Sequence, residues 1–195
     1  MLSNYAKHYQ TGETIPAEMI EKLEAASQFN QGYDFGEVVE AALLDMKWAA
    51  LSQEEAAAID TPEEVSQFER QSLEQLGLEI DLVPPRYRTT YFNHIFSSPS
   101  GYSAGYYSYL WTEMLDRDSR KWFMDNGGLT RANGDHYRKT VLSTGGTMDY
   151  FEMFRNFAGR EPDVTPMLEA RGLIAGGEAA DSEVSDGALP PQTTP

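Results

Sequence analysis

The sequence predicts an all-α protein. Apolar residues recur along most of the chain at the three- and four-residue spacing of a helix, and no long stretch alternates as a β-strand does. Glycine and proline stand where these helical stretches begin and end. A chain of 195 residues is long enough to bury a real hydrophobic core, in one domain or two small ones.

The first 85 residues are expected to form three helices. The apolar spacing predicts a helix over 16–28, a break at 29–32 and a second helix over 33–51. A capping box starts the third, because the side chains of Thr61 and Glu64 can bind each other's free backbone N–H groups, and Pro62 fits the first helical position. Gly77 is suited to end this helix, and prolines at 84–85 redirect the chain.

The region that follows is also expected to be helical, but it is richer in aromatic residues. Nine of the 23 aromatic side chains lie between positions 87 and 111. Helices are predicted near 87–96 and 104–125, separated by small residues, and two glycine pairs punctuate the later segments. A further helix over 148–158 is expected to be capped by Thr147, and Gly159 and Gly172 fit helix C-termini.

The C-terminal residues differ in composition from the rest. The segment 175–195 has almost no large apolar residue and several glycines, prolines and serines, so it cannot offset the entropy of ordering. We therefore expect a helical unit over 1–174 and a disordered acidic tail over 175–195.

The formal net charge of −16 is concentrated at the start of the chain. Residues 1–85 hold 17 acidic and 4 basic residues, whereas residues 86–177 hold 10 acidic and 11 basic ones. A solvated acidic surface explains the first part, and the nearly neutral middle is the better candidate to face a ligand. No basic patch is present to drive nucleic-acid binding.

Several other classes of protein are disfavoured by what the sequence lacks. It has no cysteine, which excludes disulfides, thiolate metal sites and thiol nucleophiles, and its three histidines are too far apart to form a metal-binding pair. No apolar run approaches the roughly 20 residues that span a bilayer. The first 20 residues lack a basic and then apolar signal sequence, which predicts a cytoplasmic protein without a membrane partner.

The candidate chemistry lies between positions 91 and 111. His94 comes before a loop of small residues, and Tyr102 and Tyr109 follow at a separation of seven, which is two helical turns. A loop folding back on its helix would bring both hydroxyls to one place. Phenol and imidazole groups are neutral hydrogen-bond donors of the kind that stabilise an oxyanion. Tyr106 and Trp111 also fit an aromatic core.

Several stretches, in order, resemble one family. FNQGYDFGEVVEAALLDMKW, PPRYRTTYFNHIF, GYSAGYYSYLW and LSTGGTMDYFEMFRNFAGREPDVTPMLEARGL are similar to the C-terminal part of the catalytic domain of the thimet oligopeptidase family of zinc metallopeptidases. Within the family, the resemblance is to the bacterial peptidyl-dipeptidase and oligopeptidase A branch, over about residues 2–174. It implies a two-lobed helical shell around a channel for short peptides, with a zinc ion held by an HExxH helix and a glutamate.

The resemblance also implies roles for individual residues. His94, Tyr102 and Tyr109 would hydrogen-bond the tetrahedral intermediate. Gly101, Gly105 and Tyr106 would line the substrate loop. A peptidyl-dipeptidase needs a group for the substrate's terminal carboxylate, and the candidates are Arg86 and Arg88.

The sequence departs from the family pattern at two places. It contains neither an HExxH motif nor the stretch that carries the glutamate ligand, and residues 97–100 make the loop slightly longer. We therefore expect part of a peptidase, with no zinc of its own and no activity alone. Its partners would be short peptides and a missing half that carries HExxH. The alternative is a non-catalytic helical module for peptide binding or interaction.

Overall fold

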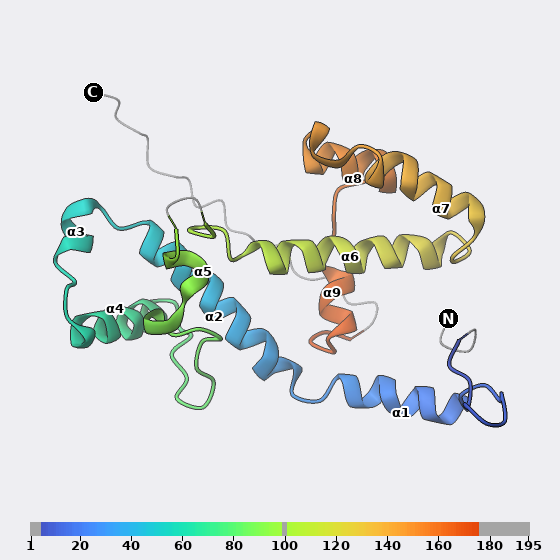
Figure 1. Ribbon diagram of the computed structural model, residues 1–195, viewed down its shortest axis with the longest axis horizontal. Helices are drawn as coiled ribbons and strands as arrows, with labels where there is room; N and C mark the ends of the chain where they lie inside the picture. The colour runs from blue at the N-terminus through green and yellow to red at the C-terminus, as the bar shows by residue number, and fades with distance from the viewer. Residues whose placement is uncertain (1–4, 99–100, 176–195) are drawn as a thin grey trace.

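The computed structural model describes residues 5–98 and 101–175, and its regular structure is helical (Figure 1). Within these two ranges no β-strand occurs, and only isolated β-bridges join Lys7 to Thr14 and Ile80 to Val83. The helical class predicted from the sequence is confirmed for this part of the chain. The expected tail lies outside the described residues, apart from Ala175.

The α-helices in the described ranges are α1 (Ala17–Ser27), α2 (Gln31–Ala49), α3 (Gln53–Ala57), α4 (Pro62–Gln75), α5 (Asn93–Phe96), α6 (Ser108–Asp125), α7 (Arg131–Tyr137), α8 (Tyr150–Ala158) and α9 (Thr165–Ala170). Short 3₁₀ turns lie at Thr89–Tyr91 and Gly145–Thr147, and a π-helical turn at Arg138–Leu142 extends α7.

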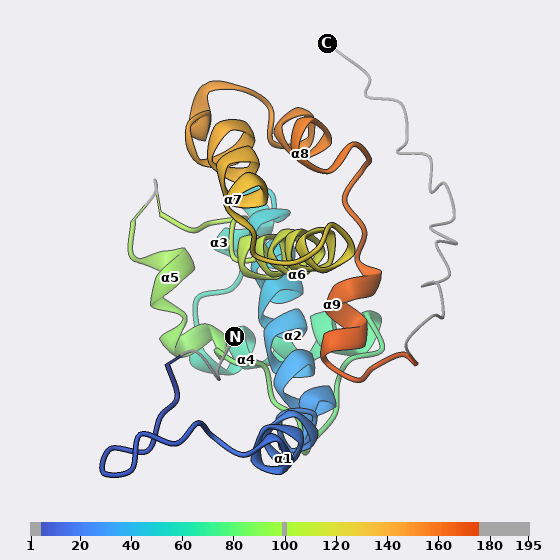
Figure 2. The same cartoon turned by 90° about the vertical axis from the view of Figure 1, so that its right-hand side faces the viewer.

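The long helices α2 and α6 organise the molecule. In Figures 1 and 2, α7 and α8 lie together on one side of α6, and α9 lies on the other side. Helix α9 packs against α6, and α4 packs against α2. Helix α1 extends outward from the start of α2, and none of its side chains is buried.

Two clusters of apolar side chains hold these helices together. The first joins α2, α5 and the start of α6, and its buried members are Ala41, Ala42, Phe92, Ile95 and Tyr106. The second is aromatic and joins α6, α7 and α8, through contacts among Trp122, Phe123, His136, Tyr137, Phe154 and Phe157. Helix α6 therefore links the first cluster to the C-terminal helices. The first cluster lies beside the loop that precedes α6, the tyrosine loop, whose described turns span residues 101–107.

Most of the residues predicted to begin or end helices do so in the structure. The capping box at Thr61 is confirmed, with Pro62 in the first turn, and Gly77 and Gly159 have the left-handed φ values of +69° and +77° that suit a helix end. The prediction that Thr147 caps α8 is wrong. Asp149 is the cap, because its carboxylate accepts the N–H groups of Phe151 and Glu152 at 3.0 and 3.1 Å.

Several predicted boundaries are also wrong. The helix expected near 104–125 begins only at Ser108, because residues 101–107 form turns. The break expected at 29–32 ends earlier than predicted, because α2 already begins at Gln31. Asn30, the residue before it, has a left-handed φ of +58°.

The helix expected near 87–96 is only a 3₁₀ turn followed by the four-residue α5, since Phe92 between them is not helical. The interruption at Phe92 separates the 3₁₀ turn from α5, and the rings of Tyr87, Phe92, Tyr102 and Tyr106 lie around His94.

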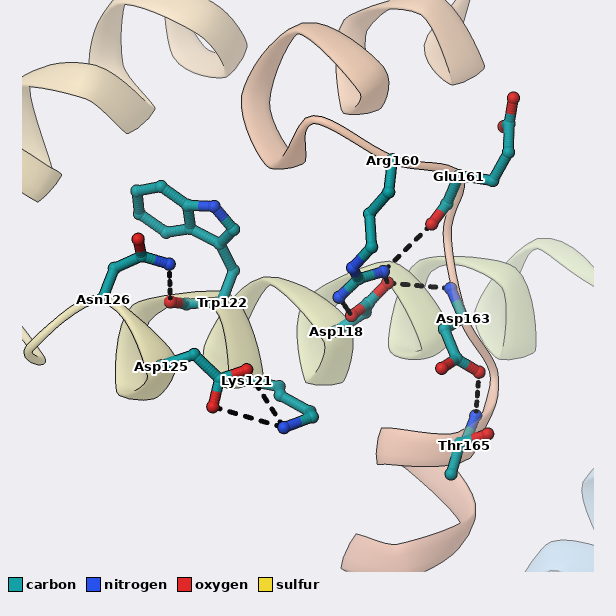
Figure 3. A network of polar contacts seen from close by, with 9 residues as sticks. All are labelled: Asp118, Lys121, Trp122, Asp125, Asn126, Arg160, Glu161, Asp163 and Thr165. Carbon is teal, nitrogen blue, oxygen red and sulfur yellow. Dashed lines mark hydrogen bonds and ion pairs between the residues drawn. The ribbon is translucent and has the colours of Figure 1, made fainter. Parts of the chain in front are cut away.

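A buried carboxylate ties α6 to the segment before α9 (Figure 3). Asp118 on α6 has no exposed surface, and it binds two nitrogens of the Arg160 guanidinium. One of its oxygens also accepts the backbone N–H of Asp163 at 2.8 Å. This network fixes where the chain turns into α9.

Candidate functional site

The three residues expected to act on substrate lie together. His94 on α5 and Tyr102 in the loop have ring centroids 6.0 Å apart, and the rings of Tyr102 and Tyr109 are stacked at 6.1 Å. The Tyr102 and Tyr109 side chains are 45% and 46% exposed. The loop and the first turn of α6 therefore present two phenols beside the imidazole of His94 at the surface of this chain.

The two tyrosine hydroxyls interact directly. A hydrogen bond with the Tyr102 hydroxyl raises the pKa of Tyr109, and desolvation adds to the effect. Burial raises the pKa of Tyr106, with contributions from Tyr87 and Tyr109. The phenols of Tyr106 and Tyr109 are thereby held in the protonated form, in which a hydroxyl can donate a hydrogen bond.

Aromatic rings fix the orientation of His94. Its ring lies 4.6 Å from that of Tyr87 and 5.6 Å from that of Tyr106, both measured between centroids. Its Nδ1 atom is buried and has no hydrogen-bond partner among the described residues. A hydrogen bond from this imidazole to a ligand must therefore be made through Nε2.

Two glycines allow the close turns of the loop. A Cβ atom at Gly105 would lie 2.9 Å from the carbonyl oxygen of Tyr102, and the N–H of Gly105 donates to that same oxygen. A Cβ atom at Gly101 would lie 3.1 Å from the carbonyl oxygen of Ser98. The N–H of Tyr102 donates to the carbonyl oxygen of His94 at 3.1 Å, which joins the loop to α5. Gly101 and Gly105 thus shape the loop backbone.

The loop is also held by a residue that the sequence did not reveal as functional. Asp45 on α2 is 1% exposed, and its two carboxylate oxygens accept the backbone N–H groups of Ala104 at 2.8 Å and Tyr106 at 2.9 Å. Ala104 has a left-handed φ of +54°, an unfavourable conformation for alanine. The available signal was an acidic residue close to the apolar residues Ala41, Ala42 and Leu44 of the same helix.

The segment that carries His94 is anchored in a similar way. Glu69 on α4 accepts the N–H of Thr89 at 2.8 Å, and the indole of Trp48 donates to the Thr89 hydroxyl at 3.0 Å. Tyr87, which the sequence also did not single out, stacks on Phe92 and lies against His94. The dense aromatic composition of this window was its only signal.

The two candidate arginines lie in different surroundings. Arg88 forms an ion pair with Glu69 at 2.8 Å. Arg86 is 3.7 Å from the carboxylate of Glu37, and it lines an open hollow of about 660 Å³ formed by α2, α6 and the end of α9. Its positive charge opposes the rise in the pKa of Tyr106. Of the two, Arg86 keeps more of its hydrogen-bonding capacity and is electrostatically coupled to the tyrosine cluster.

The zinc ion that the family resemblance implies does not fit this part of the chain. Across residues 5–98 and 101–175 there is no group of three or more histidine and carboxylate side chains that could hold a metal ion. Within the same ranges, no helix is long and apolar enough to cross a membrane.

Comparison with known proteins gives consistent matches. The model of peptidase family M3 matches residues 1–173. The chain is 44% identical over 173 residues to dipeptidyl carboxypeptidase of Escherichia coli, an alignment that covers 89% of this chain and 24% of the relative. It is 33% identical over 188 residues to an organellar oligopeptidase A of Arabidopsis thaliana, covering 92% of this chain and 22% of that protein.

Oligopeptidase A of Escherichia coli is 31% identical over 171 residues, with 85% of this chain and 23% of the relative covered. The chain thus spans about a quarter of the length of the relatives it matches. The family model covers most of the sequence, including every residue of the tyrosine loop, so the chain belongs to peptidase family M3.

Proposed function

We propose that this chain supplies the oxyanion-stabilising part of a zinc peptidase that hydrolyses short peptides. One observation carries the proposal, namely that the rings of two half-exposed tyrosines and one histidine lie side by side. Preorganised neutral donors aimed at a developing negative charge are a principal means of accelerating acyl transfer. The family membership supports this chemistry.

Each residue then has a defined task. The hydroxyls of Tyr102 and Tyr109, together with Nε2 of His94, donate hydrogen bonds to the carbonyl oxygen of the scissile peptide as negative charge develops on it. Their mutual contacts hold them in place before substrate arrives, so no reorganisation is needed at the moment of reaction. Zinc would be held by a segment that carries HExxH outside this sequence, and would supply Lewis-acid chemistry there.

The substrate that we propose is a short peptide with a free C-terminal carboxylate. One relative is a dipeptidyl carboxypeptidase, and a peptidyl-dipeptidase must recognise the terminus of its substrate. Arg86 is the better of the two candidates, since Arg88 already pairs with the buried Glu69. Gly101, Gly105 and Tyr106 shape the loop over which the peptide would lie.

A chimeric enzyme tests the proposal. The 173-residue region of Escherichia coli dipeptidyl carboxypeptidase that matches this chain is replaced by residues of this chain, and cleavage of a fluorogenic peptide is measured. Tyr109→Phe is expected to lower kcat by a factor of about 10²–10³, which corresponds to the loss of about 3–4 kcal/mol of transition-state stabilisation from one oxyanion donor. Tyr107→Phe is the matched control, because it removes a hydroxyl from a tyrosine that is two positions away and 50% exposed.

Three outcomes count against the proposal. A chimera that loses no activity on Tyr109→Phe would remove this hydroxyl from the mechanism. One tightly held zinc ion in the purified 195-residue chain would contradict the placement of the metal outside it. A folded but inactive chimera, with peptide binding retained by the chain, would favour the non-catalytic peptide-binding module.

A further inference from the structure

The tyrosine loop has little regular structure of its own to hold it. Between α5 and α6, its described residues 101–107 form turns rather than a helix. Ala104 lies in the left-handed region at φ +54°, where a Cβ atom is strained, so an external group must keep it there. The hydrogen bonds that Ala104 and Tyr106 donate to Asp45 are the interactions that meet this need.

We propose that Asp45 is the positioning residue of the peptidase site, which holds Tyr102 and Tyr109 in register through the backbone of the loop between them. The carboxylate does not touch the tyrosine hydroxyls. It accepts hydrogen bonds from Ala104 and Tyr106, the residues on either side of Gly105. The N–H of Gly105 donates to the Tyr102 carbonyl oxygen, so these three bonds together fix the turn from Tyr102 to Tyr106.

The choice of a carboxylate follows from the geometry. Two backbone N–H groups approach the two oxygens of one side chain at 2.8 and 2.9 Å, and only a carboxylate offers two acceptors in that arrangement. Charge-assisted bonds of this kind are stronger than neutral ones. Because the side chain is 1% exposed, water cannot substitute for the loop amides, and a loop that moves away leaves the charge unsatisfied.

This role also explains an acid on a buried helix face. Asp45 lies on α2 next to the buried Leu44, and its backbone belongs to the helix that carries the first core cluster. Asp45 therefore attaches the loop to the core of the protein, and the position of the loop does not depend on the loop residues alone. The link between Asp45 and a peptidase site rests on the proposed function, whereas the hydrogen bonds from Asp45 to the loop are a property of this chain alone.

The experiment uses the whole 195-residue chain and measures loop geometry, not hydrolysis. Asp45→Asn keeps the size of the side chain but sets an NH₂ group against one of the two loop amides. We expect hydrogen exchange at the Ala104 and Tyr106 amides to rise on the order of tenfold or more. We also expect loss of the nuclear Overhauser contact between the Tyr102 and Tyr109 rings, while circular dichroism retains its helical signal.

Two further variants complete the test. Asp118→Asn alters a carboxylate that is buried to the same degree and holds a different loop, so it controls for general destabilisation. It should leave the two amides and the ring contact unchanged. Asp45→Glu keeps the charge but moves it by one methylene, and it should shift the same signals in the same direction to a smaller extent.

The inference is overturned if Asp45→Asn leaves both amides and the ring contact as in the parent chain. It is equally overturned if Asp118→Asn moves them as much, or if Asp45→Asn and Asp45→Glu unfold the entire chain, since Asp45 would then be a general core residue. None of these outcomes depends on peptide hydrolysis, so an inactive chimera with an intact Asp45 effect would refute the proposed function alone.

Discussion

Replacing Glu40 by glutamine is expected to stabilise the protein, and to do so more strongly as the pH rises. The Glu40 side chain on α2 is 1% exposed, and its Oε2 atom has no hydrogen-bond partner among the described residues. Burial, and then the negative charge of Glu37, raise its pKa from 4.5 to about 7. The folded protein therefore resists ionisation of a group that ionises readily in the unfolded chain.

The sign and size of the effect follow from these two pKa values. Below about pH 4.5 the carboxyl is protonated in both states and costs nothing. Between about pH 4.5 and 7 the unfolded chain releases the proton first, so the free energy of unfolding falls as the pH rises. Above about pH 7 both states are ionised and the loss is complete, at about 3 kcal/mol.

Urea denaturation followed by circular dichroism measures this loss. Glu40→Gln is expected to exceed the parent chain in unfolding free energy by about 3 kcal/mol near pH 8, and by less than about 1 kcal/mol near pH 5. Glu21→Gln is the matched control, since it changes the net charge of −16 equally at an exposed position on α1. The same increment for Glu40→Gln at both pH values, or an equal gain from Glu21→Gln, would refute the reasoning.

Two further predictions concern how loops and helix ends are fixed. Arg160→Met leaves the buried Asp118 without its ion partner and should lower the unfolding free energy by about 3 kcal/mol, whereas Arg155→Met, from the exposed pair with Glu161, should change it little. Comparable urea midpoints for the two variants would contradict this. Asp149→Ala should cost about 1 kcal/mol and Thr147→Ala clearly less, because the Asp149 carboxylate accepts the free N–H groups of α8. The reverse order in thermal melts would restore Thr147 as the cap.

The candidate site could be predicted to the extent that its geometry is local. His94, Tyr102 and Tyr109 lie within 16 consecutive positions, so a single loop brings them together, although residues 101–107 form turns and the two tyrosines do not share a helix. Asp45 could not be found in the same way, because the amides it binds follow 59 and 61 positions later. An acid inside a helix is usually solvated, and only the tertiary fold shows that this one faces the loop.

Helix ends show the same limit on a smaller scale. Thr61, Pro62 and Glu64 all lie within one helical turn, so the sequence alone was sufficient to predict the start of α4. Thr147 and Asp149 are both good capping residues two positions apart. The choice between them depends on the 3₁₀ turn at Gly145–Thr147, which engages Thr147 before α8 begins.

The hydrogen bonds from Ala104 and Tyr106 to Asp45 limit how the length of this loop can change. Upstream, the loop is tied where the Tyr102 N–H meets the His94 carbonyl oxygen, and downstream it is tied at the carboxylate. Between these two ties the chain runs only from Tyr102 to Tyr106, and Gly105 closes it further through its bond to the Tyr102 carbonyl oxygen. An insertion or deletion within these five residues would shift Tyr102 relative to the start of α6, so this short stretch must keep both its length and its shape.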